Sequence, residues 1–275
     1  SLTKKTLNGR FAKDSYRRFI QMYGNVVLNI EGHLFEGMID NQKLNKGVLL
    51  DTELEENDWD ELITRFKELV KKKTKKNFPQ NVQQQLYGAI SAVFLSWNSQ
   101  RAKTYRKLNQ IPDHWGTAVS VQSMVFGNMG KDCSTGVVFT RNPSTGEKEF
   151  FGEYLINAQG EDVVAGTRTP QHITKKTKKK AGSKEKSMEE TMPRVFKDLK
   201  KILYKLEKHY KDMQDVEFTV ENKKLWILQT RSGKRTAEAG IKIAVDMVTE
   251  KLISKKEAIL RIDPSTLDTL LHPSL

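Results

Sequence analysis

The chain of 275 residues has little cysteine. Its single thiol, Cys133, excludes an intramolecular disulfide and is compatible with a reducing compartment. No apolar run is long enough to cross a bilayer, and residues 1–5 do not have the pattern of a signal peptide. The five histidines have no cysteine or second histidine at the spacing of zinc ligands. We therefore expect a cytoplasmic or organellar protein that is not secreted, has no membrane partner and has no zinc site.

Positive charge, in contrast, is abundant, with a formal net charge of +13. Much of it lies in two lysine clusters, at 71–76 and 175–180. Neither cluster is interleaved with aromatic residues or belongs to a recognisable nucleic-acid-reading motif. We therefore interpret both clusters as solvated lysine runs, and no nucleic-acid partner is expected.

Residues 215–231 are the most informative stretch. Two runs rich in β-branched and aromatic residues flank a short polar break, which predicts a β-hairpin. A three-residue loop at 222–224 is expected, and it places Glu221 opposite Leu225.

The same loop places Asp215 opposite Arg231 and Glu217 opposite Gln229. Because side chains alternate between faces along a strand, these four polar residues share one face. Carboxylate and amide oxygens suit Mg²⁺, and arginine offers a rigid fork for phosphate oxygens. A solvated face with a cross-strand salt bridge is the alternative. The opposite face is expected to carry Val216, Phe218, Val220, Trp226 and Leu228.

Apolar stripes at helical spacing occupy the first part of the chain. They predict a helix over 11–23 that ends at Gly24 and keeps Arg17 outside its stripe, a second over 58–73, and a third over 81–107. The stripe residues are Tyr16, Phe19, Ile20 and Tyr23; Trp59, Leu62, Ile63, Phe66, Leu69 and Val70; and Leu86, Ile90, Val93, Phe94 and Trp97.

Beyond Pro112 the period of the apolar residues changes from 3.6 to two. Strands are expected over 119–126, 136–141 and 147–156, forming an antiparallel sheet. Residues 171–190 are nearly devoid of apolar side chains, which predicts a mobile loop. Helices are then expected from Pro193 to Tyr210, from Ala237 to Leu252, and after a capping pair formed by Ser254 and Glu257.

A glycine-flanked acidic loop at 160–166 fits neither a dinucleotide fingerprint nor a Walker loop. An ordinary strand connection is one interpretation of it. Arg168 lies just beyond the loop, and Glu153 lies on the preceding strand. Both are further polar candidates, although an edge carboxylate explains Glu153 equally well.

Several stretches resemble the pyruvate phosphate dikinase family. They follow one another in order and cover nearly the whole chain apart from the segment near 171–190. The matching stretches are 10–24, 121–128, 135–143, 158–166 and 215–237.

The resemblance implies an ATP-grasp domain that gives the β,γ-phosphates of ATP to a histidine on a separate swivelling domain. Phosphoryl groups then pass to inorganic phosphate and to pyruvate, which becomes phosphoenolpyruvate. The resemblance implies that Glu217 and Gln229 are the Mg²⁺ ligands, and that these two residues and Arg231 are catalytic. It implies that Asp215 is their supporting carboxylate and that Glu161 lies near the sugar and phosphates. The residues implied to meet the adenine are Gln122, Ser123, Met124 and Val125.

The expected fold is therefore an α+β ATP-grasp fragment. It consists of a helical subdomain (1–110), a mainly antiparallel β subdomain with one packed helix (111–236), and a helical linker (237–275) toward an absent phosphohistidine domain. The family's glycine-rich phosphate loop is not found, so the fragment alone is expected to be inactive. Its implied partners are ATP and the phosphohistidine and pyruvate/phosphoenolpyruvate domains of a longer, homodimeric protein.

Two alternatives stay open at this point. A pyruvate,water dikinase shares this type of domain and differs in whether phosphate accepts the second phosphoryl group. A non-catalytic module that binds nucleotides or polyanions is the alternative of another class.

Overall fold

The computed structural model describes residues 2–164, 166 and 168–264. It forms two compact units, Ser1–Ser123 and Met124–Leu275. The domain boundaries expected after residues 110 and 236 stay a prediction, and the end of the expected linker, with His272, lies outside the described residues. No helix in the described part of the chain is long and apolar enough to cross a membrane.

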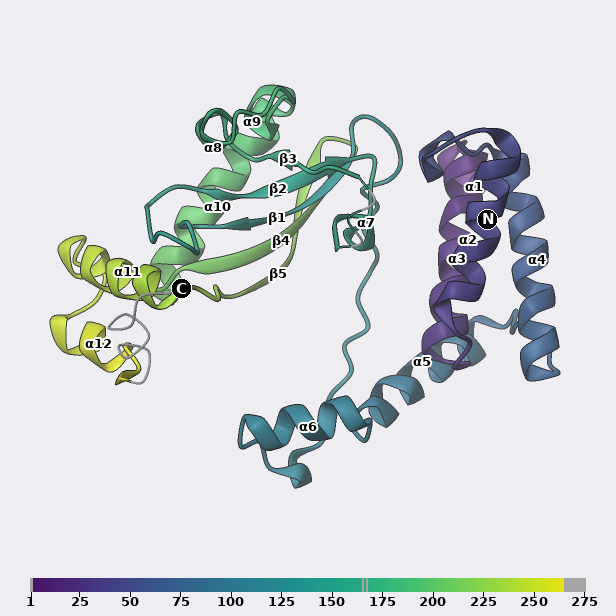
Figure 1. Cartoon of the computed structure of the whole chain (residues 1–275), viewed down its shortest axis with the longest axis horizontal. Helices are drawn as coiled ribbons and strands as arrows, with labels where there is room; N and C mark the ends of the chain where they lie inside the picture. The colour runs from purple at the N-terminus through teal and green to yellow at the C-terminus, as the bar shows by residue number, and fades with distance from the viewer. Residues whose placement is uncertain (1, 165, 167, 265–275) are drawn as a thin grey trace, which may run out of the picture. The chain divides into compact units, whose positions relative to one another are not determined.

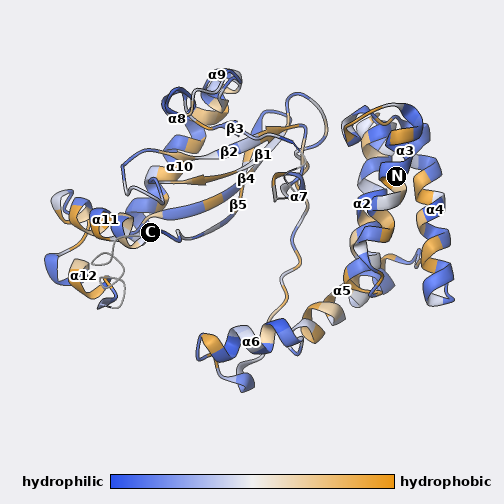
Figure 2. Ribbon diagram, viewed as in Figure 1, coloured by the Kyte–Doolittle hydropathy of each residue, from blue (hydrophilic) through white to orange (hydrophobic). Residues whose placement is uncertain are grey.

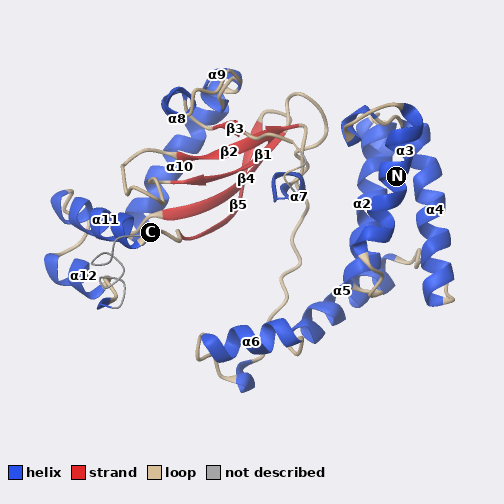
Figure 3. Ribbon diagram, viewed as in Figure 1, coloured by secondary structure: helices blue, strands red, loops and turns tan. Residues whose placement is uncertain are grey.

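The first unit is built of helices (Figures 1 and 3). α2 and α4 pack against each other, and α3 contacts both. Hydrophobic and hydrophilic residues alternate along these helices (Figure 2), and the apolar sides meet in a core around Ile20, Phe35, Trp59 and Phe66. The helices are α1 (Leu2–Thr6), α2 (Gly9–Val26), α3 (Gly32–Lys46), α4 (Glu56–Thr74), α5 (Val82–Ser96) and α6 (Gln100–Leu108).

The helix predicted over 58–73 is confirmed as α4, and all six residues of its stripe are buried. The predicted end of the first helix at Gly24 is wrong, because α2 continues to Val26. Gly24 serves close packing instead: a Cβ there would lie 2.7 Å from the ring of Phe35.

The single helix predicted over 81–107 is wrong as well. The chain breaks between α5 and α6, where the Ser99 hydroxyl accepts a hydrogen bond from Ala102 N and begins a new helix. None of the described side chains of α5 is buried, so its stripe does not point into a core.

Arg17, predicted to lie outside the stripe of α2, is buried. Its guanidinium donates to Asp14 at 2.9 Å and to Asp51 at 3.0 Å. It also lies over the ring of Trp59, 4.5 Å from the centroid. Two carboxylates and an aromatic face therefore offset the cost of burying this charge.

The second unit is built on a five-stranded antiparallel sheet in the order β3-β2-β1-β4-β5 (Figures 1 and 3). α10 (Pro193–Tyr210) packs on one face, where Leu199 and Leu203 join the core formed by Val138, Val216 and Phe218. The strands are β1 (Ser134–Phe139), β2 (Phe151–Ile156), β3 (Gln171–His172), β4 (Gln214–Glu221) and β5 (Lys224–Ser232).

Three further helices flank this sheet. α7 (Gly160–Val164) contacts β1 and β2. α11 (Ala237–Thr249) and α12 (Lys255–Leu260) form a small core of their own with Met213. The predicted helix after residue 236 is confirmed as α11, and the predicted capping box of Ser254 and Glu257 is confirmed at the start of α12.

The strand predicted over 119–126 is wrong. This segment pairs with no strand in the described structure, and the side chains of Val121 and Met124 are exposed. β1 is already paired on both sides, with β2 and with β4, so the segment cannot pair with β1.

The mobile loop predicted over 171–190 is wrong too. The segment contains β3, α8 (Lys175–Lys180) and α9 (Met188–Thr191). Its few apolar side chains are used fully, because Ile173 and Met188 are completely buried. Lys176 and Lys180 reach the buried carboxylate of Glu149 at 2.8 and 2.9 Å, which fixes α8 to the loop before β2.

Candidate functional site

The hairpin with the predicted site residues is formed by β4 and β5. Its turn has two residues, Asn222 and Lys223, with φ of 49° and 66°, as in a type I′ turn. Glu221 therefore pairs with Lys224. The predicted three-residue loop, with Glu221 opposite Leu225, is wrong.

A β-bulge then restores the predicted pairing. The register shifts between Glu217 and Phe218, which leaves Leu228 as an extra residue in β5. The prediction of the two polar pairs is thus confirmed by a shorter turn and a bulge together. The resulting pairs are Phe218–Ile227, Glu217–Gln229 and Asp215–Arg231.

The two faces of the hairpin differ partly from the prediction. Trp226 and Leu228, expected on the apolar face, are 39% and 37% exposed. Leu225 and Ile227 pack against the α10 core in their place. The residues of the apolar face that are confirmed as buried are Val216, Phe218 and Val220.

The face of the sheet opposite α10, called here the open face, carries the polar pairs. Arg231 Nε donates to Asp215 Oδ2 at 2.8 Å, and Arg231 Nη2 lies 3.7 Å from Glu217 Oε1. The hydrogen bond to Asp215 raises the pKa of Arg231. The side chain of Asp215 is 8% exposed, and its Oδ1 is buried with no hydrogen-bond partner in the described part of the chain.

Glu153 belongs to the same row of the open face. It pairs with Val137, which pairs in turn with Glu217, so two strand spacings, roughly 10 Å, separate the two carboxylates. Since β3 pairs with β2 at His172, Glu153 is not on an edge strand. The expectation of an edge carboxylate is therefore wrong.

The segment predicted to meet the adenine is placed only in part. Gln122 and Ser123 are exposed residues of the first unit, and Met124 and Val125 open the second. The next amide, Phe126 N, donates to Glu221 Oε2 at 2.7 Å.

Glu221 is a residue that the sequence reasoning missed. It lies four positions after Glu217 in β4, which corresponds to roughly 13 Å. The alternation of Asp215, Glu217 and Thr219 continues to Glu221 and was the available signal. This geometry brings Met124 and Val125 to one end of the open face and the polar pairs to the other.

Glu161 lies in the first turn of α7. The loop before it is tied to the same end of the sheet, because Ala158 N donates to Gly127 O at 2.9 Å and Gln159 Nε2 donates to Asn128 Oδ1 at 3.0 Å. Arg168 donates to the carbonyl oxygens at the end of β2, which gives its guanidinium a structural task.

The polar pairs fit Mg²⁺ chemically. Among the described residues, no group of three or more His, Cys, Asp or Glu is placed to hold a metal by itself. Mg²⁺ does not need such a group, because it takes one or two carboxylates and completes its shell with water and substrate phosphates. The half-exposed carboxylate of Glu217 and the exposed side-chain amide of Gln229, which pairs with it across the hairpin, offer oxygen donors of this kind.

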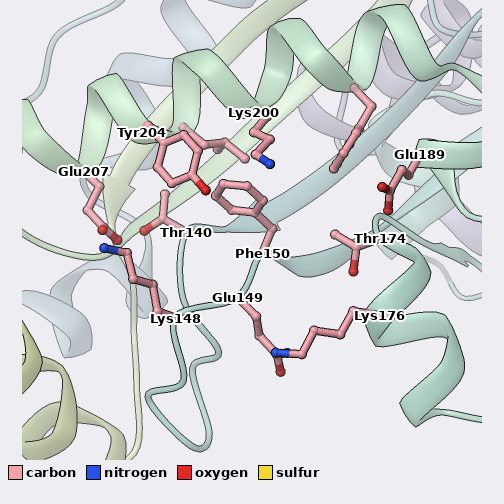
Figure 4. A pocket seen from close by; sticks show the side chains of 12 residues that line it. Thr140, Lys148, Glu149, Phe150, Thr174, Lys176, Glu189, Lys200, Tyr204 and Glu207 are labelled. Atoms are coloured by element: carbon pink, nitrogen blue, oxygen red, sulfur yellow. The ribbon is translucent and has the colours of Figure 1, made fainter.

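A separate pocket of ≈ 220 Å³ lies on the α10 side of the sheet (Figure 4). Lys148, Lys176 and Lys200 enter it beside Phe150 and Tyr204, whose rings meet edge to face at 5.2 Å. The predicted site residues do not line it. The carboxylates that line the pocket already have partners, as described above for Glu149. The lining therefore does not indicate whether a ligand would be positively or negatively charged.

The antiparallel sheet, with one face covered by α10 and oxygen donors and an arginine on the open face, is that of an ATP-grasp nucleotide-binding domain. Residues 81–198 and 194–252 match the family model described as the AMP/ATP-binding domain of pyruvate phosphate dikinase. The chain belongs to the pyruvate phosphate dikinase family.

Relatives named pyruvate, phosphate dikinase align with almost the whole chain. The protein of Rhizobium meliloti is 57% identical over 268 residues, which are 98% of this chain and 30% of the relative. That of Clostridium symbiosum is 54% identical over 272 residues, again 98% and 30%. A protein of Flaveria trinervia named as chloroplastic is 50% identical over 264 residues, 96% of this chain and 26% of the relative. The chain thus spans between 26% and 30% of the length of these relatives.

Proposed function

We propose that the chain is the nucleotide-binding part of a pyruvate phosphate dikinase. In this reaction ATP, pyruvate and phosphate become AMP, phosphoenolpyruvate and pyrophosphate. A histidine on another domain takes the β,γ-phosphates of ATP and AMP leaves. The terminal phosphoryl group then passes to phosphate and the remaining one to pyruvate. The observation that carries the proposal is the pair of neighbouring rungs, Asp215–Arg231 and Glu217–Gln229, on one open face.

Each member of these rungs has a distinct task in the proposal. Asp215 holds Arg231 by the hydrogen bond at 2.8 Å, so the guanidinium is oriented before the nucleotide arrives. Arg231 offsets the charge on the phosphate oxygens as it develops during transfer. Glu217 and Gln229 would hold Mg²⁺, which would offset the negative charge of the phosphates.

The adenosine end of the proposed site lies near Met124 and Val125, with Gln122 and Ser123 before them. Backbone groups of this segment would recognise the base. Glu161 would lie near the sugar and phosphates. The roughly 13 Å from Glu221 to Glu217 suits an ATP molecule lying along β4.

The test is made in the complete dikinase that contains this chain. Glu217→Ala and Arg231→Ala are expected to lower transfer of label from ATP to the histidine by at least about 100-fold, as removal of a transition-state donor does. Glu238→Ala, which removes an exposed carboxylate from the first turn of α11, is the matched control and should leave transfer unchanged. Full activity of both site variants would refute the proposal.

Calorimetry separates binding from transfer. ATP should bind the complete protein more tightly with Mg²⁺ than without it, and Glu217→Ala should remove most of that difference. The same titration of the 275-residue chain examines whether it holds a sufficient nucleotide site by itself. Equal ATP affinity with and without Mg²⁺ in the complete protein would contradict the assignment of the Mg²⁺ ligands.

The alternatives are less favoured. The relatives described above are named pyruvate, phosphate dikinase, which speaks against a water-dependent enzyme. Turnover with and without phosphate distinguishes the two. A non-catalytic module would bind polyanions with steep salt dependence and no response to Mg²⁺. The homodimer, the absence of nucleic-acid and membrane partners, and a cytoplasmic or organellar location stay predictions.

A further inference from the structure

The turn of the hairpin and the residue before it form hydrogen bonds with the segment that precedes β1. The Glu221 carboxylate accepts Phe126 N at 2.7 Å, a hydrogen bond between residues 95 positions apart. Asn222 N donates to Cys133 Sγ at 3.2 Å, and Lys223 N donates to Asp132 O at 3.0 Å. Three consecutive residues of the turn therefore hold the two ends of the loop from 126 to 133.

The same loop is held from its other side. Gly127 O accepts Ala158 N at 2.9 Å, and a Cβ on Gly127 would lie 2.3 Å from Ala158 O. Asn128 Oδ1 accepts Gln159 Nε2 at 3.0 Å. The backbone at 126–128 is therefore fixed between the hairpin turn and the loop before α7, with no room for a side chain on Gly127.

Of these contacts, the one made by Glu221 lies closest in sequence to Met124 and Val125. It is charge-assisted, and bonds of this kind are roughly twice as strong as neutral ones. The other carboxylate contact of the turn, between Lys223 Nζ and Asp132 Oδ2 at 3.1 Å, lies at the far end of the loop. Glu221 belongs to the same strand as Glu217. A rigid strand therefore connects the phosphate end of the open face to the backbone at the base end.

We infer that Glu221 is a positioning residue for the purine base. This positioning role rests on the proposed function. By holding Phe126 N, Glu221 sets the position of Met124 and Val125 relative to Glu217 and Gln229, and thus the distance between base recognition and the Mg²⁺–phosphate end. Loss of this contact would move the backbone at the base end and leave Glu217 and Gln229 in place, so the effect falls on ATP recognition and on the choice between adenine and guanine nucleotides.

The experiment uses the complete dikinase with three variants. Glu221→Ala removes the acceptor, Glu221→Asp withdraws it by one methylene, and Glu221→Gln keeps an acceptor oxygen at full length. The first two should raise KM for ATP by roughly 10- to 100-fold, the loss expected for one hydrogen bond to a charged group, change kcat far less and lower the preference for ATP over GTP. Glu221→Gln should restore most of both. Lys224→Ala, on the opposite side of the same turn, is the control and should keep the wild-type values.

Hydrogen exchange gives a readout that does not depend on activity. The amide of Phe126 should exchange faster in Glu221→Ala and Glu221→Asp than in the wild type and in Glu221→Gln, while β1 keeps its protection. If Glu221→Ala does not fold, Glu221→Asp serves in its place.

An unchanged KM and ATP/GTP preference in Glu221→Ala or Glu221→Asp would overturn the inference, as would a loss of kcat alone. The proposed function is judged separately by Glu217→Ala. If Glu217→Ala abolishes phosphoryl transfer and the Glu221 variants are silent, only the positioning role fails. If Glu217→Ala is also silent, the proposed function fails.

Discussion

The buried guanidinium of Arg141 provides the sharpest prediction about stability. Its side chain is completely buried at the end of β1, where it donates to Glu207 of α10 at 2.9 and 3.0 Å and to Glu250 at 2.9 Å. These interactions link the sheet, α10 and the end of α11. Burial by itself lowers the pKa of Arg141, but the hydrogen bonds that it donates to the two carboxylates outweigh burial and raise the pKa.

The perturbation is Arg141→Met, which keeps most of the aliphatic volume and removes the charge. Glu207, with a side chain 7% exposed, is then a buried carboxylate without its cation. Breaking a buried pair in this way costs about 3–5 kcal/mol. Glu250 suffers less, because it is 25% exposed and keeps Lys148 at 2.7 Å. For a unit of this size the loss corresponds to a fall in Tm of about 6–20 °C.

Urea unfolding of the 275-residue chain, with hydrogen exchange to locate the change in the second unit, measures the effect. Arg141→Met/Glu207→Leu should recover most of the lost stability, because neither charge is left unpaired. Lys148→Met, which removes only an exposed partner, should change the unfolding free energy by less than about 1 kcal/mol. A loss below about 1 kcal/mol in Arg141→Met, or a double variant as unstable as the single one, would refute the reasoning.

Two further predictions concern pH and backbone packing. Burial raises the pKa of Glu149, but hydrogen bonds from Lys176 and Lys180 lower it from 4.5 to about 2, so its stabilisation is present above pH 4.5 and is lost as the pH falls toward 2. The difference in urea midpoint between wild type and Glu149→Gln should therefore shrink over that interval, and a constant difference would contradict it. Gly127→Ala should destabilise by at least about 1–3 kcal/mol, because its Cβ would meet Ala158 O at 2.3 Å. Gly37→Ala, in open space on α3, should stabilise by about 0.5–1 kcal/mol in the same urea assay.

The helices that could be predicted from sequence are those with a single buried stripe. α4 and α10 have one, and their predicted positions are confirmed. α3 was not predicted, because Phe35 and Ile39 are its only apolar residues that are buried and polar residues occupy most of the rest. The prediction of α5 failed for the opposite reason. Its own apolar residues lie on all sides of the helix, so their spacing alone did not show which side is covered.

The hairpin shows how two cross-strand pairs can be predicted correctly from a wrong turn. A three-residue loop and a two-residue turn followed by one bulged residue shift the register equally. Glu217 therefore faces Gln229 in both cases, and only residues between the turn and the bulge change partners. The composition of the turn does not reveal the bulge at Leu228, which depends on how β5 packs against the α10 core.

Charge composition misled the interpretation of residues 171–190 for a related reason. Lysine runs are typical of solvated segments, but Lys176 and Lys180 have a partner outside this segment, whereas Lys178 pairs with Glu190 inside it. Glu149 is 26 or more residues away and becomes a partner only when β2 and β3 pair. Two buried side chains, Ile173 and Met188, are then enough to anchor the segment.

The polar pairs at the proposed phosphate end could be predicted because they consist of side chains at alternating positions, two carboxylates, an amide and a guanidinium. The contact at the proposed base end could not, because it joins a backbone amide to a carboxylate 95 positions away. A pattern of residue types records the first kind of information and not the second. Because Glu221 and Glu217 belong to one strand, the contact with Phe126 N would let β4 set the distance between base and phosphates in the proposed site. A change of length or register in β4 would therefore disturb recognition at both ends together.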